Sequence, residues 1–168
     1  MNFRLAEEKD LESIKNVFRE IVADMYAHGL EIWDDVFPVE FFAGDIENSC
    51  LYILEDESAI VSAFSFHENA EGESCVRWNF PAKKVFYLGR FGVNVQYRHR
   101  GLAAEMLRRA ANLAREKGAD ALRLFVVDEN APAIRLYEKC GFIRAEGVYK
   151  EEIDEELTLN EYGYEIPV

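Results

Sequence analysis

The chain has 168 residues, of which 49% are hydrophobic and 30% charged, and its formal net charge is −13 at pH 7. This length predicts one domain over residues 1–168 with a sizeable core, and the composition excludes wholesale disorder. The acidic excess argues against general nucleic-acid binding, because neutralising phosphates supplies most of that affinity.

Cysteine usage and the chain start indicate where the protein works. Cys50, Cys75 and Cys140 are scattered and odd in number, which fits neither a disulfide framework nor a zinc site. The N-terminus is charged and lacks the apolar core of a signal peptide, and no run approaches the ~18 apolar residues of a membrane span. We therefore expect a cytoplasmic protein without a membrane partner.

The N-terminal part predicts strand Asn2–Leu5, a helix from Asp10 to Gly29, a short helix from Pro38 to Ile46, and strands Leu51–Leu54 and Ile60–Phe66. The first helix is inferred from apolar residues at three- and four-residue spacing between Leu11 and Met25, with Asp10 as its cap. Proline is tolerated in the first turn of a helix. The polar run 55–58 predicts a hairpin turn.

The remainder predicts a loop (68–74), an ambiguous segment (76–84), a strand (85–95), a helix (101–117), a buried strand (121–127), a helix ending at Gly141, and strands 142–150 and 157–166. Gly89 and Gly92 within their strand indicate a bulge or a close backbone approach by a ligand. Either Asp128 or Asn130 caps the last helix. The segment from 85 to 127 requires a parallel strand pair, so a mixed sheet with helices on both faces is expected.

A basic turn separates the strand that ends near Val95 from the helix that begins at Gly101. Residues 83–123 hold ten basic and three acidic residues within an acidic chain, which favours a local site for an anion. Backbone N–H groups in the first turn of a helix lack internal partners and suit a phosphate, and Arg98 and Arg100 add charge. An ordinary turn with solvated arginines explains the same residues equally well.

Two segments resemble signatures of a known family. Arg98-x-x-Gly101-x-Ala103 resembles the pyrophosphate loop of the GNAT superfamily of acyl-CoA N-acyltransferases, whose pattern is Q/R-x-x-G-x-G/A. The stretch from Asn130 to Phe142 is similar to the second signature, N-x-x-A-x-x-x-Y-E-x-x-G-F. The two occur in the family's order with a strand between them. His99 stands where the family often has Gly, which leaves the detail of the loop open.

The resemblance implies an α/β fold with a mixed sheet of about seven strands, four flanking helices and splayed central parallel strands. It also implies acetyl transfer from acetyl-CoA to an amine without a metal, and homodimers are common among relatives. By carry-over, the acetyl-CoA site comprises main chain near Phe91, Val93 and Val95, the turn Arg98, His99, Arg100, Gly101, Leu102, Ala103 and Ala104, and the residues Asn130, Ala133 and Tyr137.

Tyr137 matches the family's tyrosine, which lies near the thioester sulfur and can protonate the departing thiolate. A phenol has a pKa of about 10, so it is neutral and able to donate a proton at pH 7. Its spacing alone favours a core aromatic residue, because Ile134 shares its helix face; the complete signature favours the catalytic interpretation.

The acceptor side is less defined. A lysine-like ammonium needs a base, since its deprotonation at pH 7 costs roughly 4.6 kcal/mol. Many relatives carry an acid early in the strand at 85–88, which has none here. Glu68 and His67, at the end of the preceding strand, are the nearest substitutes, and a solvated strand-end residue is the competing interpretation. Trp33, Trp78 and Arg90 are candidate pocket residues, with aromatic packing as the alternative for each tryptophan. The acidic loop 151–156 is suited to attract a cationic amine or simply to be solvated.

Two other classes compete with an N-acetyltransferase. A non-catalytic acyl-CoA sensor needs the basic turn but not a functioning Tyr137. A nucleotide-binding protein is disfavoured, because both G-x-x-x-x-G-K-[ST] and G-x-G-x-x-G are missing from the sequence.

Overall fold

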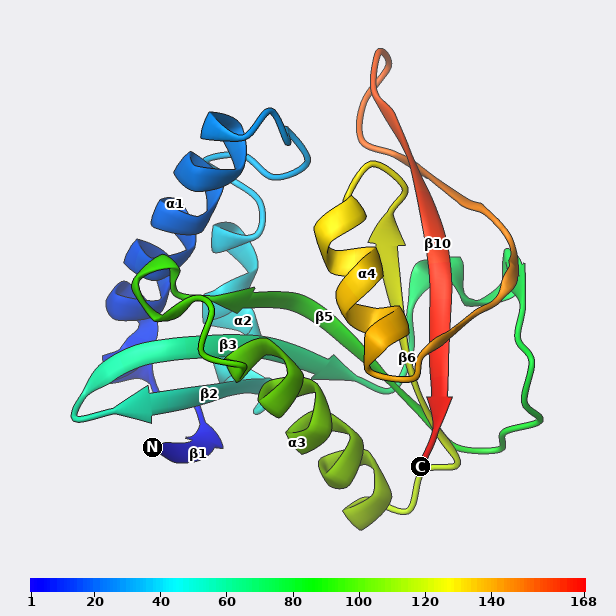
Figure 1. Ribbon diagram of the computed structural model, residues 1–168, viewed down its shortest axis with the longest axis horizontal. Coiled ribbons are helices and arrows are strands. Elements are labelled where there is room, and N and C mark those ends of the chain that lie inside the picture. The colour runs from blue at the N-terminus through cyan, green and yellow to red at the C-terminus, as the bar shows by residue number, and fades with distance from the viewer. The chain divides into compact units, whose positions relative to one another are not determined.

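Two units make up the computed structural model, which describes every residue from Met1 to Val168 (Figure 1). Unit 1 comprises Met1–Phe66 and Gly89–Met106, and unit 2 comprises His67–Leu88 and Leu107–Val168. The chain passes between the units within strand β5 (Val85–Val93) and within helix α3 (Leu102–Glu116).

Unit 1 begins with an antiparallel meander. Its elements are β1 (Asn2–Leu5), η1 (Glu8–Asp10), α1 (Leu11–Ala27), η2 (Val39–Phe41), α2 (Phe42–Glu47), β2 (Leu51–Asp56), β3 (Ala59–His67) and η4 (Val95–Tyr97), where η denotes a 3-10 turn. β2 pairs with β1 and with β3, and β5 follows β3. Glu57 and Ser58 join β2 to β3 with φ values of 49° and 81°, the left-handed conformation of a tight hairpin turn. The predicted hairpin is thereby confirmed.

The core of unit 1 forms under α1. The predicted periodicity places Ile14, Phe18 and Ile21 at no more than 5% exposure, packed with Phe42 of α2. A Cβ atom on Gly92 would lie 2.8 Å from both Phe18 and Ile21. Gly92 therefore makes room for α1, a reason for glycine that the sequence analysis did not foresee.

The side chain of Asp10 does not cap α1 as predicted. Its carboxylate accepts a hydrogen bond from the Glu7 backbone N–H at 2.8 Å and binds both terminal nitrogens of Arg4 at 2.7 and 3.0 Å. It closes the η1 turn before α1 instead of capping α1 itself. Its ion pair with Arg4 lowers the pKa of Asp10.

Unit 2 is organised around the parallel pair that the sequence predicted. Val85–Leu88 of β5 pair with Ala121–Leu124 of β6, and β10 runs antiparallel to β6. α4 packs on this sheet, with the Tyr137 ring 6.4 Å from that of Tyr164 (Figure 1). The elements are η3 (Glu71–Ser74), β4 (Val76–Arg77), β6 (Ala121–Val127), α4 (Ala131–Lys139), β7 (Ile143–Arg144), β8 (Glu146–Gly147), β9 (Tyr149–Glu152) and β10 (Thr158–Pro167).

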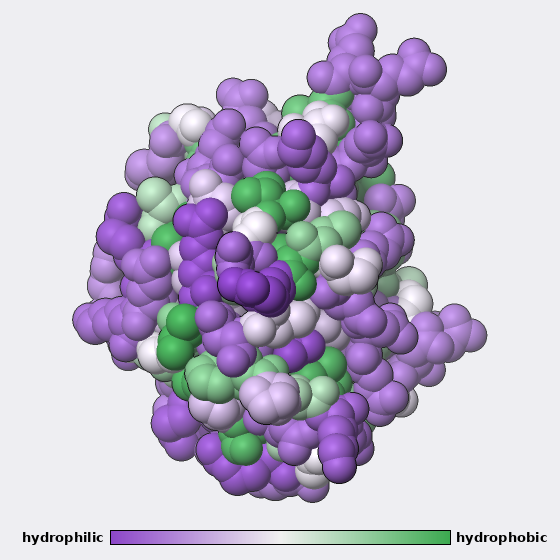
Figure 2. All heavy atoms as spheres, turned by 90° about the vertical axis from the view of Figure 1, so that its right-hand side faces the viewer, coloured by the Kyte–Doolittle hydropathy of each residue, from purple (hydrophilic) through white to green (hydrophobic).

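The predicted strand 142–150 is wrong as a single element. β7 and β9 pair with β10, whereas β8 leaves the main sheet and pairs with β4. Gly147 has a φ of 105°, a conformation that favours glycine and turns the chain between these pieces. Figure 2 shows a mostly hydrophilic face with small separate hydrophobic groups, as the charged composition leads one to expect.

The complete strand order agrees with the expected mixed α/β architecture. The main sheet has eight strands instead of about seven, in the order β1-β2-β3-β5-β6-β10-β7, with β9 also paired to β10. β4 and β8 form a separate two-stranded sheet. Four α-helices are present, as expected. None of them is both long enough and apolar enough to cross a membrane.

Candidate active site

In unit 1, a turn with two left-handed residues leads into α3. His99 and Gly101 have φ values of 61° and 76°, and an added Cβ on Gly101 would meet nothing within 4 Å. The first helical hydrogen bond runs from the Glu105 N–H to the Gly101 carbonyl, so the N–H groups before Glu105 have no acceptor within the helix. Free N–H groups at the start of a helix are what the predicted anion site requires.

The two arginines of the turn have different partners. Arg98 forms an ion pair with Asp24 of α1, and both side chains are about one-third exposed. The Arg100 guanidinium lies 5.0 Å from the centre of the Tyr97 ring. Sequence reasoning missed Asp24, because nothing in the spacing of α1 marks it as a partner of a residue 74 positions away.

In the C-terminal half of β5, the backbone N–H and C=O groups of every second residue point away from β3. The Ser62 hydroxyl donates to the Gly92 carbonyl at 2.6 Å, and the Asn94 N–H donates to the Val61 carbonyl at 2.8 Å. Because successive residues of a strand direct their N–H and C=O groups to opposite edges, those of Phe91 and Val93 point away from β3. Val95 lies beyond the strand, in η4, packed against the core of unit 1.

In unit 2, α4 begins at Asn130. Its Oδ1 accepts a hydrogen bond from the Ala133 N–H at 3.2 Å, so Asn130, and not Asp128, is the cap. The amide nitrogen of Asn130 takes no part in this cap and can donate a hydrogen bond to a ligand.

Tyr137 is buried on the inner face of α4. The residue is 7% exposed, and its ring lies 5.9 Å from that of Phe142. Burial raises the pKa of the phenol above its ordinary value of 10.0, so the hydroxyl stays protonated at neutral pH. No protein group in the structure forms a hydrogen bond with it.

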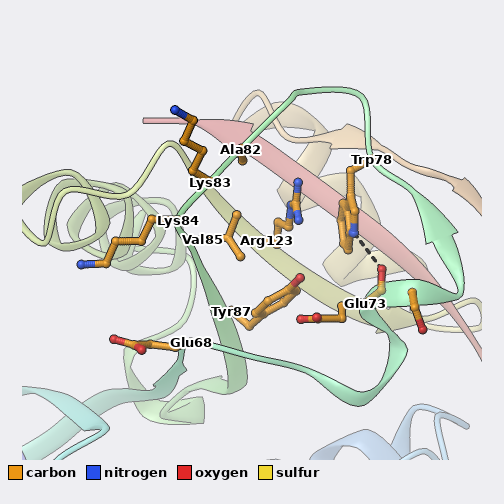
Figure 3. A pocket seen from close by; sticks show the side chains of 10 residues that line it. Glu68, Glu73, Trp78, Ala82, Lys83, Lys84, Val85, Tyr87 and Arg123 are labelled. Atoms are coloured by element: carbon orange, nitrogen blue, oxygen red, sulfur yellow. Dashed lines mark hydrogen bonds between the residues drawn. The ribbon is translucent and has the colours of Figure 1, made fainter.

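A second feature of unit 2 is an open pocket of about 450 Å³. The Tyr87 hydroxyl points between Glu73 and Arg123, while Lys83 and Lys84 lie at the opposite rim (Figure 3). Burial raises the pKa of Tyr87, and the neighbouring Arg123 acts against this rise. The pocket therefore combines the aromatic side chains of Tyr87 and Trp78 with the carboxylates of Glu68 and Glu73 and the ammonium groups of Lys83 and Lys84.

A buried ion pair fixes the floor of this pocket. Glu165 is fully buried and accepts hydrogen bonds from the N–H groups of Asn79 and Phe80 and, at 3.2 Å, from Arg123 Nε. The Arg123 guanidinium lies 4.3 Å from the ring centre of Trp78, whose indole N–H donates to the Glu73 carbonyl. These contacts hold Trp78 in place.

The remaining predicted acceptor residues fall in both units. Glu68 lines the pocket and is exposed, and Trp78 lines it too. Trp33 lies in unit 1, with its ring 5.9 Å from that of Phe18, and Arg90 is bound there by Asp45. Trp33 and Arg90 thus take part in packing and an ion pair of unit 1.

Glu161 is a half-buried carboxylate that sequence reasoning missed. It lies in β10 with Val127 of β6 and Tyr149 of β9 as cross-strand neighbours. Burial, with a smaller contribution from Glu151, raises the pKa of Glu161 to about 7. The Tyr149 hydroxyl donates a hydrogen bond to the Glu71 carboxylate at 3.3 Å, which places a further negative charge near Glu151 and Glu161. The only sequence signal for Glu161 was its position in a strand of alternating polar and apolar residues.

The raised pKa makes stability depend on pH. The folded protein holds the Glu161 proton more tightly than the unfolded chain, whose ordinary value is 4.5. This stabilisation is complete below that value and is lost as pH rises through about 7, by up to ~3 kcal/mol. We expect Glu161→Gln to raise the melting temperature at pH 8 more than at pH 5. An equal rise in melting temperature at both pH values would contradict this prediction. So would the same pH-dependent rise for Glu155→Gln, a control in the exposed hairpin loop.

Comparisons with known proteins agree with the fold. The Acetyltransferase (GNAT) family model matches residues 14–142, and the chain belongs to this family of acetyltransferases. Members of the family use acetyl-CoA and an acceptor substrate.

Individual relatives are similar over most of the chain. A Bacillus subtilis (strain 168) protein, provisionally named a phosphinothricin acetyltransferase, is 29% identical over 143 residues, which are 84% of this chain and 83% of that protein. A GNAT acetyltransferase from Streptococcus agalactiae has a TM-score of 0.82 at 18% identity, covering 99% and 95% of the two chains. A ribosomal-protein-alanine N-acetyltransferase from Brucella melitensis has a TM-score of 0.72 at 20% identity over both full chains. The two solved structures support the fold.

Proposed function

We propose that the protein is an N-acetyltransferase that moves an acetyl group from acetyl-CoA directly to a primary amine of a small molecule or peptide. The observation that carries this proposal is in unit 1, where backbone groups of Phe91 and Val93 directed away from β3 precede the open start of α3. An extended pantetheine arm would pair with the former as an added strand, and the diphosphate would bind the latter.

The diphosphate would be held by the turn from Arg98 to Ala104. Its oxygens would accept hydrogen bonds from the free N–H groups at the start of α3, and Arg98 would exchange part of its contact with Asp24 for the phosphate. In unit 2, Asn130 and Ala133 at the start of α4 would contact the arm.

The chemistry requires several proton transfers. The neutral amine attacks the thioester carbonyl, a C–N bond forms, the C–S bond breaks, and the buried Tyr137 phenol gives its proton to the thiolate. The attacking nitrogen releases its second proton as the amide forms, and the Tyr137 phenolate takes up a proton to restore the phenol. The amine first loses a proton to a carboxylate. Glu68, which lines the pocket, is the candidate for this base.

The acceptor would occupy the pocket lined by Trp78 and Tyr87. Its ammonium group would be attracted by Glu68 and Glu73, and a substrate anion would be attracted by Lys83. A zwitterionic amine would therefore find partners for both of its charges.

A thiol-release assay with acetyl-CoA tests the function. The amine panel includes polyamines, amino acids, phosphinothricin and an alanine-terminated peptide, the last two suggested by the names of relatives. We expect amine-dependent release of CoA with one class clearly preferred. Saturable acetyl-CoA binding without transfer to any amine would instead indicate a sensor, and stronger binding of ATP than of CoA would indicate a nucleotide-binding protein.

A further inference from the structure

Arg90 adopts a backbone conformation in β5 that a glycine would be expected to occupy. Its φ is 45°, whereas Gly89 and Gly92 on either side have no left-handed φ. A left-handed residue within a strand marks a bulge of the kind that normally uses glycine there. Arginine pays a conformational penalty at this position, so its side chain must hold the conformation from outside the strand.

The side chain of Arg90 is held at three points within unit 1. Nε and one terminal nitrogen of Arg90 donate to the two carboxylate oxygens of Asp45 at 2.8 and 2.7 Å. The guanidinium also lies 5.1 Å from the centre of the Phe41 ring. Only 16% of the Arg90 side chain and 8% of the Asp45 side chain are exposed, so this bidentate pair is largely shielded from solvent.

The bulge decides which backbone groups of β5 are available. Gly92 and Asn94 face β3, and therefore Phe91 and Val93 face away from it. If residue 90 relaxed to an extended conformation, the bulge would be removed and the alternation beyond it would shift by one residue. The groups of Gly92 would then replace those of Phe91 and Val93 at the free edge.

We propose that the Asp45–Arg90 ion pair is a positioning device for acyl-CoA: it holds the bulge and so directs the backbone of Phe91 and Val93 toward the pantetheine arm. The inference rests on the proposed function, because it requires that CoA binds along β5. Arg90 acts through the strand in this inference, as a positioning residue.

The test uses calorimetric titration of the full chain with coenzyme A, and compares alanine with glycine at residue 90. Glycine adopts the left-handed conformation without help, whereas alanine does not. We expect Arg90→Ala to bind coenzyme A about tenfold more weakly than Arg90→Gly. Asp45→Ala should weaken binding by a similar factor, and adding Arg90→Gly to Asp45→Ala should recover most of the loss.

A second ion pair of unit 1 provides the matched control. Asp10 binds Arg4 in the same bidentate manner and is 7% exposed, but it lies at the start of α1. Asp10→Ala should lower the melting temperature without changing the dissociation constant for coenzyme A. In turnover, the Asp45 and Arg90 variants should raise the KM for acetyl-CoA more than they lower kcat.

Several outcomes would overturn the inference. Equal binding by the Ala and Gly variants at residue 90 would show that backbone conformation is not what the pair controls. If Asp45→Ala behaves as Asp10→Ala does, the pair serves stability alone. If Asp45→Ala does not fold, the comparison at residue 90 still decides the question. Failure of the unmodified protein to bind coenzyme A would instead reject the proposed function.

Discussion

Replacing Tyr137 by Phe is expected to lower kcat about 100-fold, a rate effect typical for loss of a general acid. The dissociation constant for CoA should change by no more than about twofold, because the acid acts on the departing thiolate and not on binding. The ring would keep its packing against Phe142 and Tyr164, because the hydroxyl has no protein partner to lose. Only the proton donor for the departing thiolate would be missing. Steady-state kinetics with acetyl-CoA and the preferred amine measure the effect.

Tyr162→Phe is the matched control, since Tyr162 lies in β10 and its ring is covered by the Arg144 guanidinium at 3.4 Å. It removes the same atom from a residue with no proposed role in transfer. An unchanged kcat for Tyr137→Phe would leave Tyr137 as a packing residue and reject its role as the acid.

Ala104→Glu is expected to weaken CoA binding at least about 100-fold, because a carboxylate within ~4 Å of a phosphate costs ~4 kcal/mol near a protein surface. Ala104 is exposed in the first turn of α3, where the diphosphate is proposed to bind. A negative charge at that place otherwise favours the helix by ~0.3–1 kcal/mol. The variant should therefore lose binding without losing thermal stability, which separates a defective site from a defective fold.

Ala104→Gln has nearly the same shape without the charge, and it should retain most of the CoA affinity. Calorimetric titration and thermal unfolding of both variants measure binding and stability together. If the Glu variant binds CoA as the Gln variant does, the diphosphate does not lie at the start of α3.

Several elements could be predicted because their signals are local. The periodicity from Leu11 to Met25 gave α1, and alanine-rich sequence before Gly118 gave α3, where Gly118 has a φ of 74°. The parallel pairing of β5 with β6 followed from a strand, a long helix and a second strand. In contrast, the division of residues 143–152 into β7, β8 and β9 depends on whether β4 or β10 is the pairing partner of each piece. No local sequence pattern determines that partner.

The sequence by itself determined the two family signatures, the helix start that follows the basic turn, and the residues Asn130 and Tyr137, because each depends on neighbours within one or two turns of chain. Only the tertiary structure decided the partners of Arg98, Arg90 and Arg123, which are Asp24, Asp45 and Glu165. It also decided that Glu161 is half-buried with its pKa near 7. Ion pairs and desolvation depend on distance in space, and residues far apart in the chain become neighbours only when it folds.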